Sequence, residues 1–381
     1  MRSKALLLGS LVVGIMSAGC AVAYEAEEGE VGDAQQAYVS RAWAYAWAHQ
    51  ATGSYTATSS YSRNSAGDNF AEGLDNTVSQ IATGRYRVRF PDVGAAPGGH
   101  VQVTAYGGGS ERCKVNSWLR SGDDVDVYVN CFTAGGAPVD AKFSVAYVRK
   151  SGTGSSGEAY VWANNATAAA YTPDPMYQFN STGASNTIAR QGVGYYAVTL
   201  PGQTASGGTV EVTAYGAGSD HCKVGSWGQS GNNVVAYVRC FDSAGAPSDG
   251  RFTLNFARSR AVNGGLSYSY AWANNATAAS YTPHLSYQEG YIAGDLGDVE
   301  ADITAARTSA GRYSLSLPGM SATGSNVQVT AYGSGPEYCK VVGWGGSETT
   351  ANVNVACFDE SGAPADSRFV LVYTDDKFIV L

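Results

Sequence analysis

Charged residues are scarce in this sequence, and no part of it is strongly basic. Asp, Glu, Lys and Arg make up 15% of the 381 residues, and the formal net charge at pH 7 is −8. Nucleic acids and anionic membrane surfaces attract proteins through clustered Lys and Arg, so neither is an expected partner. A helical spacing of apolar residues is also missing, whereas Gly (48) and Tyr (25) are abundant. This composition favours strands joined by tight turns.

Catalytic motifs are missing as well. The chain has four histidines, His49, His100, His221 and His284, and it contains neither a G-x-S-x-G nor an H-E-x-x-H pattern. None of the four recurs at an equivalent position of the internal repeat described below. We therefore predict no catalytic residues and no enzyme activity.

Metal and cofactor sites are not indicated either. Asp123 and Asp124 share one turn, as calcium ligands do, but the other copies of the repeat carry Asn or Thr pairs there. The paired cysteines lack the recurring His, Cys or acidic partners that a zinc site needs. We predict no metal and no cofactor.

One segment of the chain occurs three times. Residues 101–143 begin VQVTAYG, and residues 210–252 and 327–369 match them over 43 positions without insertion or deletion. Each copy contains Cys-Lys-Val, a Trp five residues after that Cys, a second Cys eighteen residues after the first, and a closing Asp-x-Lys/Arg-Phe. A fixed period of this kind indicates tandem modules.

The repeat divides the chain into units near the commonest domain size. We assign a signal peptide to residues 1–23, an acidic flexible tether to 24–37, modules to 38–150, 158–258 and 266–374, linkers to 151–157 and 259–265, and a tail to 375–381. The first linker is rich in Gly and Ser and is expected to be flexible. The apolar tail either adds an edge strand or docks back onto the third module.

Alternation of apolar and polar residues predicts the strands. Tyr86, Val88 and Phe90 alternate with polar residues, which places one strand face in a core and the other in water. About eight such strands per module, separated by Gly, Pro, Asn and Asp turns, predict an all-β chain of three tandem antiparallel β-sandwich modules of immunoglobulin-like or related type. A small closed barrel is the alternative for each module.

Six of the seven cysteines form three pairs. The two members of each pair are 18 residues apart within one module, which predicts three disulfides and an oxidising compartment. If the turn between them centres on Gly122, the first Cys lies opposite its partner, and the bridge staples a hairpin in register. The predicted pairs are Cys113 with Cys131, Cys222 with Cys240, and Cys339 with Cys357.

The seventh cysteine, Cys20, belongs to an N-terminal export signal. A basic start precedes an apolar run over residues 5–18, which is too short to span a bilayer as a mature helix. The sequence SAGC at residues 17–20 resembles a lipoprotein box with Ser in place of the usual Leu. Lipidation of Cys20 predicts an outer-membrane or cell-surface lipoprotein, held to the membrane by this anchor alone, whereas ordinary cleavage after Ala23 predicts a secreted extracellular protein.

Strand parity assigns the recurring charged residues to outward faces. The Lys of Cys-Lys-Val points away from the core of its own module, and we expect it to be exposed. An Asp lies two residues before the closing Lys or Arg, which predicts a weak surface ion pair, with a ligand-binding carboxylate as the alternative. We identify it as the one acid that recurs in all three copies. These residues are Lys114, Lys223 and Lys340, and Asp140, Asp249 and Asp366.

Recurring aromatic residues form a candidate ligand face. The Tyr of VTAYG has outward parity, and the Trp after the first Cys lies beside the hairpin turn. Exposed flat rings next to hydroxyls and amides suit stacking on sugars, whereas the alternative is that these rings cover a sandwich edge or pack between modules. A second recurring Trp, at positions 47, 162 and 272, is expected in the core. The candidate residues are Tyr106, Tyr215, Tyr332, Trp118, Trp227 and Trp344.

The phrases WANNATAASYTP, VQVTAYG, CKVVGW and CFDESGAPADSRF resemble repeat modules of secreted and lipoprotein families of myxobacteria and actinobacteria. The resemblance covers nearly all of residues 40–374. Those families have no assigned activity, so the resemblance implies export and modularity only.

These features favour a non-enzymatic protein of the cell surface or the extracellular space. We expect it to act in adhesion or as a structural component of an envelope or matrix, with a repetitive surface polymer or polysaccharide as partner, because repetition of a weak binding module raises avidity. A multivalent, lectin-like carbohydrate-binding protein is the second hypothesis, and a hydrolase-like enzyme is the third. Exposure of the recurring rings would favour carbohydrate binding, and their burial would favour a scaffold.

Overall fold

The computed structural model describes residues 41–66, 75–151, 157–262, 264–294, 296–376 and 378–379. The predicted signal peptide, Cys20 and the acidic tether lie outside these residues, and so does most of the first linker. The described residues belong to one compact unit. No helix within these ranges is both long enough and apolar enough to cross a membrane.

The fold is all-β, as predicted. We call modules 1, 2 and 3 the parts of the chain that carry β1–β9, β10–β18 and β19–β28. Each has more strands than the predicted eight, because very short edge strands are added. Module 1 contains β1 (Arg41–Ala48), β2 (Ser54–Thr56), β3 (Ser62–Asn64), β4 (Thr77–Ala82), β5 (Arg85–Phe90), β6 (His100–Tyr106), β7 (Arg112–Ser121), β8 (Asp124–Phe132) and β9 (Lys142–Lys150).

Modules 2 and 3 repeat this order. Module 2 contains β10 (Glu158–Ala163), β11 (Ala170–Tyr171), β12 (Gln178–Asn180), β13 (Thr187–Gly192), β14 (Tyr195–Pro201), β15 (Gly208–Tyr215), β16 (His221–Ser230), β17 (Asn233–Phe241) and β18 (Arg251–Arg258). Module 3 contains β19 (Ser267–Ala273), β20 (Ser280–Tyr281), β21 (Gln288–Gly294), β22 (Gly297–Asp298), β23 (Thr304–Ser309), β24 (Arg312–Pro318), β25 (Asn326–Tyr332), β26 (Tyr338–Gly346), β27 (Thr350–Phe358) and β28 (Arg368–Asp375). One 3₁₀ turn per module completes the set: η1 (Ser59–Tyr61), η2 (Pro175–Tyr177) and η3 (Leu285–Tyr287).

Each module is a sandwich of two half-sheets, as predicted. In module 1, β1, β3, β6 and β9 form what we call the inner half-sheet, and β2, β4, β5, β7 and β8 form the outer half-sheet. Alternate residues of both, such as Val103 and Val145 on one side and Val88 and Val127 on the other, meet in a single buried cluster. Equivalent clusters fill modules 2 and 3. Burial of these side chains is the main force that holds each sandwich together.

The three predicted disulfides are present. Each joins directly opposed residues of neighbouring strands, with Cα atoms 4.0 Å apart. The predicted register of the cysteines is correct, although the β7–β8 turn is centred between Gly122 and Asp123 and not on Gly122, because Ser121 pairs with Asp124. A register shift between Val115 and Ser117 compensates, because the extra residue brings Cys113 back opposite Cys131. Structural disulfides of this kind indicate an oxidising environment.

Removal of one disulfide should lower stability measurably. Replacing both Cys113 and Cys131 by Ala should lower the free energy of unfolding by roughly 3 kcal/mol, because the unfolded chain regains the entropy of an opened loop. Urea unfolding at pH 7 measures the loss, and thiol labelling of the denatured variant should find four protected cysteines in the other two modules. A change below about 0.5 kcal/mol would contradict a structural role for the bridge.

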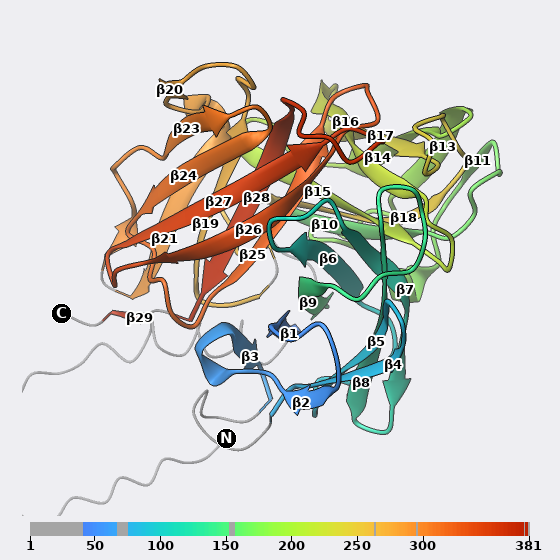
Figure 1. Ribbon diagram of the computed structural model, residues 1–381. Coiled ribbons are helices and arrows are strands. Elements are labelled where there is room, and N and C mark those ends of the chain that lie inside the picture. Colours follow the sequence, from blue (N-terminus) through green and yellow to red (C-terminus); the bar gives the residue numbers. More distant parts are fainter. Residues whose placement is uncertain are drawn as a thin grey trace, which may run out of the picture. The chain divides into compact units, whose positions relative to one another are not determined.

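The sheets do not stop at module boundaries. The three sheets run in the orders β20-β23-β24-β27-β26-β6-β9-β1-β3, β12-β10-β18-β15-β7-β8-β5-β4-β2, and β11-β13-β14-β17-β16-β25-β28-β19-β21-β22. In each, the outer half-sheet of one module continues into the inner half-sheet of another through a short parallel contact: β7 with β15, β16 with β25, and β26 with β6. Module 1 is thus joined to module 2, module 2 to module 3, and module 3 back to module 1 (Figure 1). The ring of modules is closed within one chain.

The second linker and the C-terminal tail also pack against module 3. Ala261 and Val262 of the second linker are buried in a small cluster with Tyr268 and Tyr270 of module 3. The C-terminal tail adds an edge strand, β29 (Phe378–Ile379), which pairs in parallel with β21. Of the two alternatives for the tail, the structure therefore has the edge strand.

Candidate functional site

One face of each inner half-sheet packs into the core of its own module. The opposite faces of the three inner half-sheets pack against one another. Thr104 of β6 accepts a hydrogen bond at Oγ1 from the backbone N–H of Val329 in module 3, at 3.0 Å. The equivalent threonines do the same around the ring: Thr330 accepts from Val212 and Thr213 accepts from Val103, both at 3.2 Å. A face with outward parity in each module is thus buried between modules and bound to the backbone of another module.

Buried ion pairs also run around the ring, but from each module to the neighbour on the other side. Nζ of Lys114 lies 2.8 Å from Asp220 of module 2, Nζ of Lys223 lies 3.1 Å from Glu337 of module 3, and Nζ of Lys340 lies 2.9 Å from Glu111 of module 1. The lysine side chains are 1–4% exposed, whereas the acids are 22–33% exposed. The expectation that these lysines are exposed is wrong, because the neighbouring module covers the outward face of the strand.

The acids of these pairs were missed from the sequence. Glu111, Asp220 and Glu337 occupy one position of the repeat, two residues before the first Cys. The prediction that the recurring Asp is the one acid shared by all three copies is therefore wrong. The repeat itself held the signal, because this position is Asp or Glu in all three copies.

Burial and pairing act in opposite directions on these groups. Burial lowers the pKa of Lys114, Lys223 and Lys340, and the charge of the paired acid counteracts it. Burial alone would raise the pKa of Glu111, but its hydrogen bond to Lys340 holds that pKa below the ordinary value. Each lysine thus depends on its acid to stay charged.

A third ring of contacts uses different side chains at one position. Arg112 donates from Nε and Nη2 to the carbonyl of Ser219, at 3.3 and 3.2 Å. His221 donates from Nε2 to the carbonyl of Pro336 at 2.7 Å, and Tyr338 donates from its hydroxyl to the carbonyl of Ser110 at 2.7 Å. The three carbonyls are equivalent in the repeat. Arg, His and Tyr therefore do the same structural task with different chemistry.

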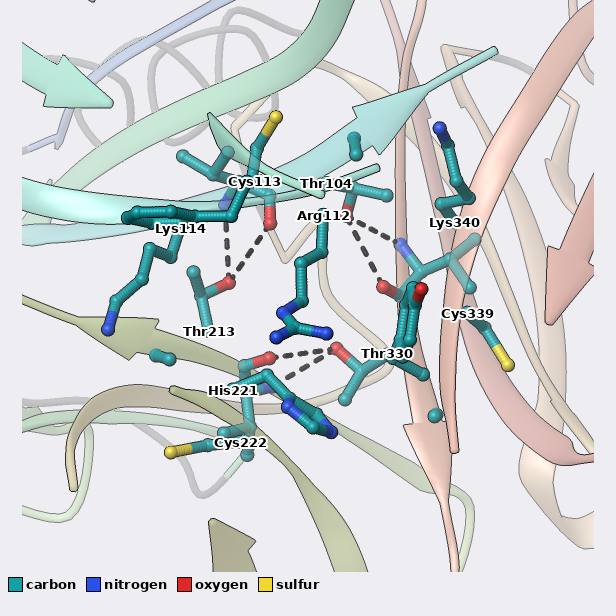
Figure 2. A pocket seen from close by; sticks show the side chains of 18 of the residues that line it. Thr104, Arg112, Cys113, Lys114, Thr213, His221, Cys222, Thr330, Cys339 and Lys340 are labelled. Carbon is teal, nitrogen blue, oxygen red and sulfur yellow. Dashed lines mark hydrogen bonds between the residues drawn. The ribbon is translucent and has the colours of Figure 1, made fainter. Parts of the chain in front are cut away.

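These rings line a partly open cavity where all three modules meet. Its volume is about 60 Å³, and its lining includes the three threonines, Lys114, Lys340 and the trio Arg112, His221 and Tyr338. Figure 2 shows the guanidinium of Arg112 extending between the strands toward the middle of this group. Burial lowers the pKa of His221 to about 4, with the charge of Arg112 adding to the effect. The imidazole is therefore neutral at pH 7.

The recurring aspartates make their contacts within their own modules. The carboxylate of Asp249 accepts two hydrogen bonds from Arg190, at 2.9 and 2.8 Å, and one each from the backbone of Gly194 and the hydroxyl of Tyr196. Asp366 makes the equivalent contacts, and Asp140 accepts from Gln80 and Gly84. The predicted pairing with the base two residues later is wrong, since that base lies over the Tyr of VTAYG instead. The bases are Lys142, Arg251 and Arg368.

The six candidate rings come together, but each cluster contains residues of two modules. Tyr106 lies 5.6 Å from Trp344 between ring centroids, Tyr215 lies 5.6 Å from Trp118, and Tyr332 lies 5.5 Å from Trp227. Two more rings complete each cluster, a half-buried Trp of the first strand and the Tyr that ends the 3₁₀ turn. These are Trp47 and Tyr61, Trp162 and Tyr177, and Trp272 and Tyr287. The rings thus fill the joints between modules, and none of them is fully exposed.

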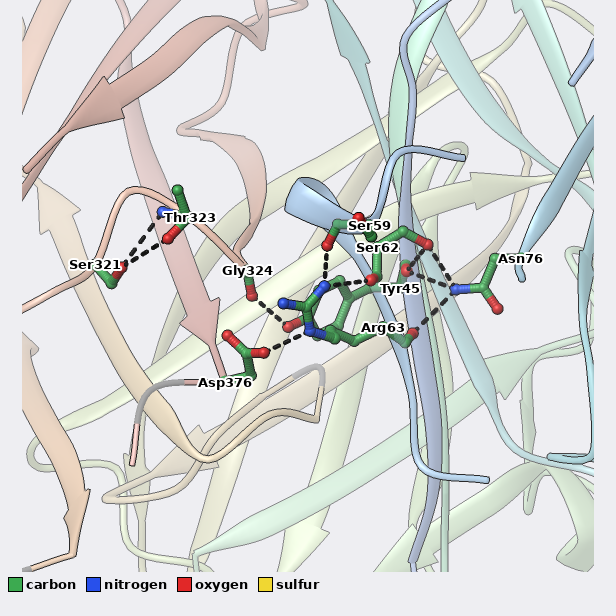
Figure 3. A network of polar contacts seen from close by, with 9 residues as sticks. All are labelled: Tyr45, Ser59, Ser62, Arg63, Asn76, Ser321, Thr323, Gly324 and Asp376. Carbon is green, nitrogen blue, oxygen red and sulfur yellow. Dashed lines mark hydrogen bonds and ion pairs between the residues drawn. The ribbon is translucent and has the colours of Figure 1, made fainter. Parts of the chain in front are cut away.

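The joint of modules 3 and 1 has additional polar contacts. The hydroxyl of Tyr45 donates to the carbonyl of Gly324 at 2.6 Å, and Arg63 pairs with Asp376 (Figure 3). Asn76 donates from its amide to the carbonyls of Tyr45 and Arg63, at 3.1 Å each (Figure 3). This network holds β1 and β3 against the end of the chain.

Module 3 has a hollow at the place where its sequence is longest. A cavity of about 210 Å³ is lined by Ser269, Glu289, Gly290, Asp302 and six further residues. Modules 1 and 2 have Asn64 and Asn180 at the position of Gly290, and Asn180 fills this space with hydrogen bonds to Asn186 and the backbone. The predicted divergence of this region therefore has a structural counterpart, although Asp295 lies outside the described residues.

Within the described ranges, no three His, Cys, Asp or Glu side chains are grouped so that they would hold a metal ion. Comparison of the chain with protein-family models, curated proteins and solved structures gives no match.

Proposed function

We propose that the chain is a non-enzymatic, exported surface protein in which three β-sandwich modules act as one rigid structural or adhesive element. The observation that supports this function is the place of the recurring side chains. The rings, lysines and acids that a repeated ligand face would need lie in the joints between modules. These recurring residues hold the three modules together in a closed ring.

The closed ring suits a load-bearing or adhesive role. Modules on flexible linkers gain avidity only if their linkers span the binding sites, whereas a fixed geometry keeps all three surfaces at constant spacing. Cross-strand disulfides in each module, together with parallel strand contacts between modules, resist local opening. A protein of an envelope or matrix needs this resistance more than it needs mobile domains.

Carbohydrate binding at one site is the second candidate, and the hollow of module 3 favours it. The hollow combines polar groups of Ser269, Gln288 and Asp302 with apolar walls from Val299 and Ile303. Such mixed linings orient hydroxylated ligands in small sites. This site would be single, in contrast to the three-fold repeated face predicted from the sequence.

Sedimentation with isolated cell envelopes and insoluble polysaccharides tests the proposal. We expect residues 38–381 to co-sediment in a saturable way, to release no soluble product, and to bind equally well after Gly290→Asn, which gives module 3 the residue of modules 1 and 2. Circular dichroism of Gly290→Asn checks that the variant folds, since a Cβ at Gly290 would lie 3.1 Å from Cβ of Val299. Competition by a soluble sugar together with loss of binding in this variant would favour the second candidate. Release of soluble fragments, or no association with any envelope or polymer, would overturn the proposal.

A further inference from the structure

The cavity shared by the three modules carries one cation without a counter-ion. Lys114 and Lys340 in its lining are paired with Asp220 and Glu111. Arg112 is in no ion pair of the described residues. Its nearest acids are used elsewhere: Asp220 binds Lys114, and Oδ1 of Asp242 accepts the backbone N–H groups of Ala244 and Ala246 in its own turn. A guanidinium does not lose its proton in a protein, so a net positive charge stays in this junction.

One side of the Arg112 guanidinium also lacks a hydrogen-bond partner. Nε and Nη2 donate to Ser219, but Nη1 is buried and donates to no described group, and the residue is only 6% exposed. The ring of Tyr338, 5.3 Å from Cζ, covers one face of the guanidinium. Nδ1 of His221, another cavity residue, is also buried without a partner, but it is an acceptor in the neutral ring whose Nε2 donates to Pro336, so it does not itself contribute to anion binding. A buried charged donor left unsatisfied is strongly unfavourable, so a guest that accepts from Nη1 and carries negative charge would be bound.

We propose that this cavity is a binding site for one small monovalent anion, of the size of chloride, bromide or nitrate, held by Nη1 of Arg112 where the three modules meet. The volume of about 60 Å³ is sufficient for a guest of this size, since a single water needs only about 10–15 Å³ of such a cavity. Gluconate, a much larger polyhydroxylated anion, serves as the reference anion. The charge of Arg112 favours an anion over a water alone, whereas the lysines in the lining are neutralised by their paired acids.

The site has a consequence for the assembly. Its lining contains residues of all three modules, so the anion binds the closed ring and not a chain in which one joint has opened. A ligand that binds only the folded state stabilises it in proportion to its occupancy. The unfolding equilibrium constant should therefore fall with anion concentration, with a limiting log–log slope near one ion per chain.

The repeat supplies matched controls. Arg112→Tyr and Arg112→His place at this position the residues that Tyr338 and His221 already provide in the other modules, so both variants should fold. Neither should bind the anion, because each removes Nη1 and its charge. General salt effects act equally on the parent and the variants and cancel in their difference.

The experiment uses residues 38–381 and sodium salts of chloride, bromide, nitrate and gluconate at equal ionic strength. We expect the midpoint of thermal unfolding of the parent, measured relative to that of Arg112→Tyr in the same salt, to be higher by several degrees in the three small anions than in gluconate. Crystals grown in bromide should show an anomalous peak within about 3.5 Å of Nη1. Equal salt responses of parent and variant, or water alone at Nη1 in the bromide crystals, would overturn the proposal. Should Arg112→Tyr fail to fold, Arg112→His and the bromide crystals decide the question.

Discussion

Replacing Glu337 with Gln should lower the free energy of unfolding by about 3 kcal/mol or more, whereas replacing its partner Lys223 with Met should lower it by about 1 kcal/mol or less. The asymmetry follows from burial. The Lys223 side chain is 1% exposed and the Glu337 side chain is 32% exposed. Without the acid, an ammonium group is left in a site where burial already lowers its pKa. Without the lysine, the carboxylate can take up water.

Urea unfolding at pH 7 measures both changes. The double variant Glu337→Gln, Lys223→Met should recover most of the loss, since it removes the uncompensated charge. The other joints provide replicates in Glu111→Gln against Lys340→Met and Asp220→Asn against Lys114→Met. The exposed pair Arg120 and Asp123 is the control, and Asp123→Asn should change stability by no more than about 0.5 kcal/mol. Equal losses for Glu337→Gln and Lys223→Met would contradict the argument that removing the partner of the more deeply buried charge costs more stability.

Features that lie within one module could be predicted from the sequence. The 18-residue Cys spacing recurs in three copies, so the pairing of Cys113 with Cys131 needed no information from the rest of the chain. Alternation of Val and polar residues likewise determines which side chains of β6 and β8 enter the module core. Such local patterns are read directly because a strand has a period of two.

What covers the second face of a strand could not be predicted. Parity correctly places Thr104, Lys114 and Tyr106 away from the core of module 1, but it does not distinguish water from another protein surface. That distinction depends on contacts between residues more than a hundred positions apart, such as Thr104 with Val329. The polar residues on this face suggested exposure to water. In the structure they are buried, and they bind backbone groups and one another across the joints between modules.

For the same reason, the sequence could not show which residues of the candidate ligand face pack against one another. Tyr106 and Trp118 belong to one copy of the repeat, yet Tyr106 packs against Trp344 and Trp118 packs against Tyr215. A repeat shows which residues are equivalent, but not whether a contact is made within one copy or with the next. Ring closure decides that, and it is set by the summed geometry of all three modules.

Acidification should destabilise the protein between about pH 6.5 and pH 4, and two buried histidines should cause most of this loss. His100 is 1% exposed and His221 is 7% exposed. Burial lowers their pKa values to about 3 and about 4, with Lys150 adding to the effect at His100 and Arg112 at His221. The amide of Gln102 lies 2.9 Å from Nε2 of His100, where it donates only to a neutral ring.

The sign of the effect follows from proton binding. Both histidines titrate near their ordinary pKa in the unfolded chain, so between pH 6.5 and pH 4 the unfolded state binds more protons than the folded state. Stability is therefore fully present above about pH 6.5 and falls as the pH is lowered, by up to about 1.4 kcal/mol per pH unit for each histidine. Over the whole window the loss reaches roughly 3 kcal/mol for His221, and it continues below pH 4 for His100.

The variant His100→Asn, His221→Tyr tests this with residues that module 3 already has at these positions, Asn326 and Tyr338. Its free energy of unfolding in urea should match that of the parent at pH 7.5 to within about 1 kcal/mol and exceed it by several kcal/mol at pH 4.5. Carboxylates such as Glu158, which pairs with Lys150, titrate in both proteins and cancel in the comparison. Parallel pH profiles for the two proteins would show that these imidazoles accept protons in the folded state, and that the cavity and the interface around His100 admit a charge after all.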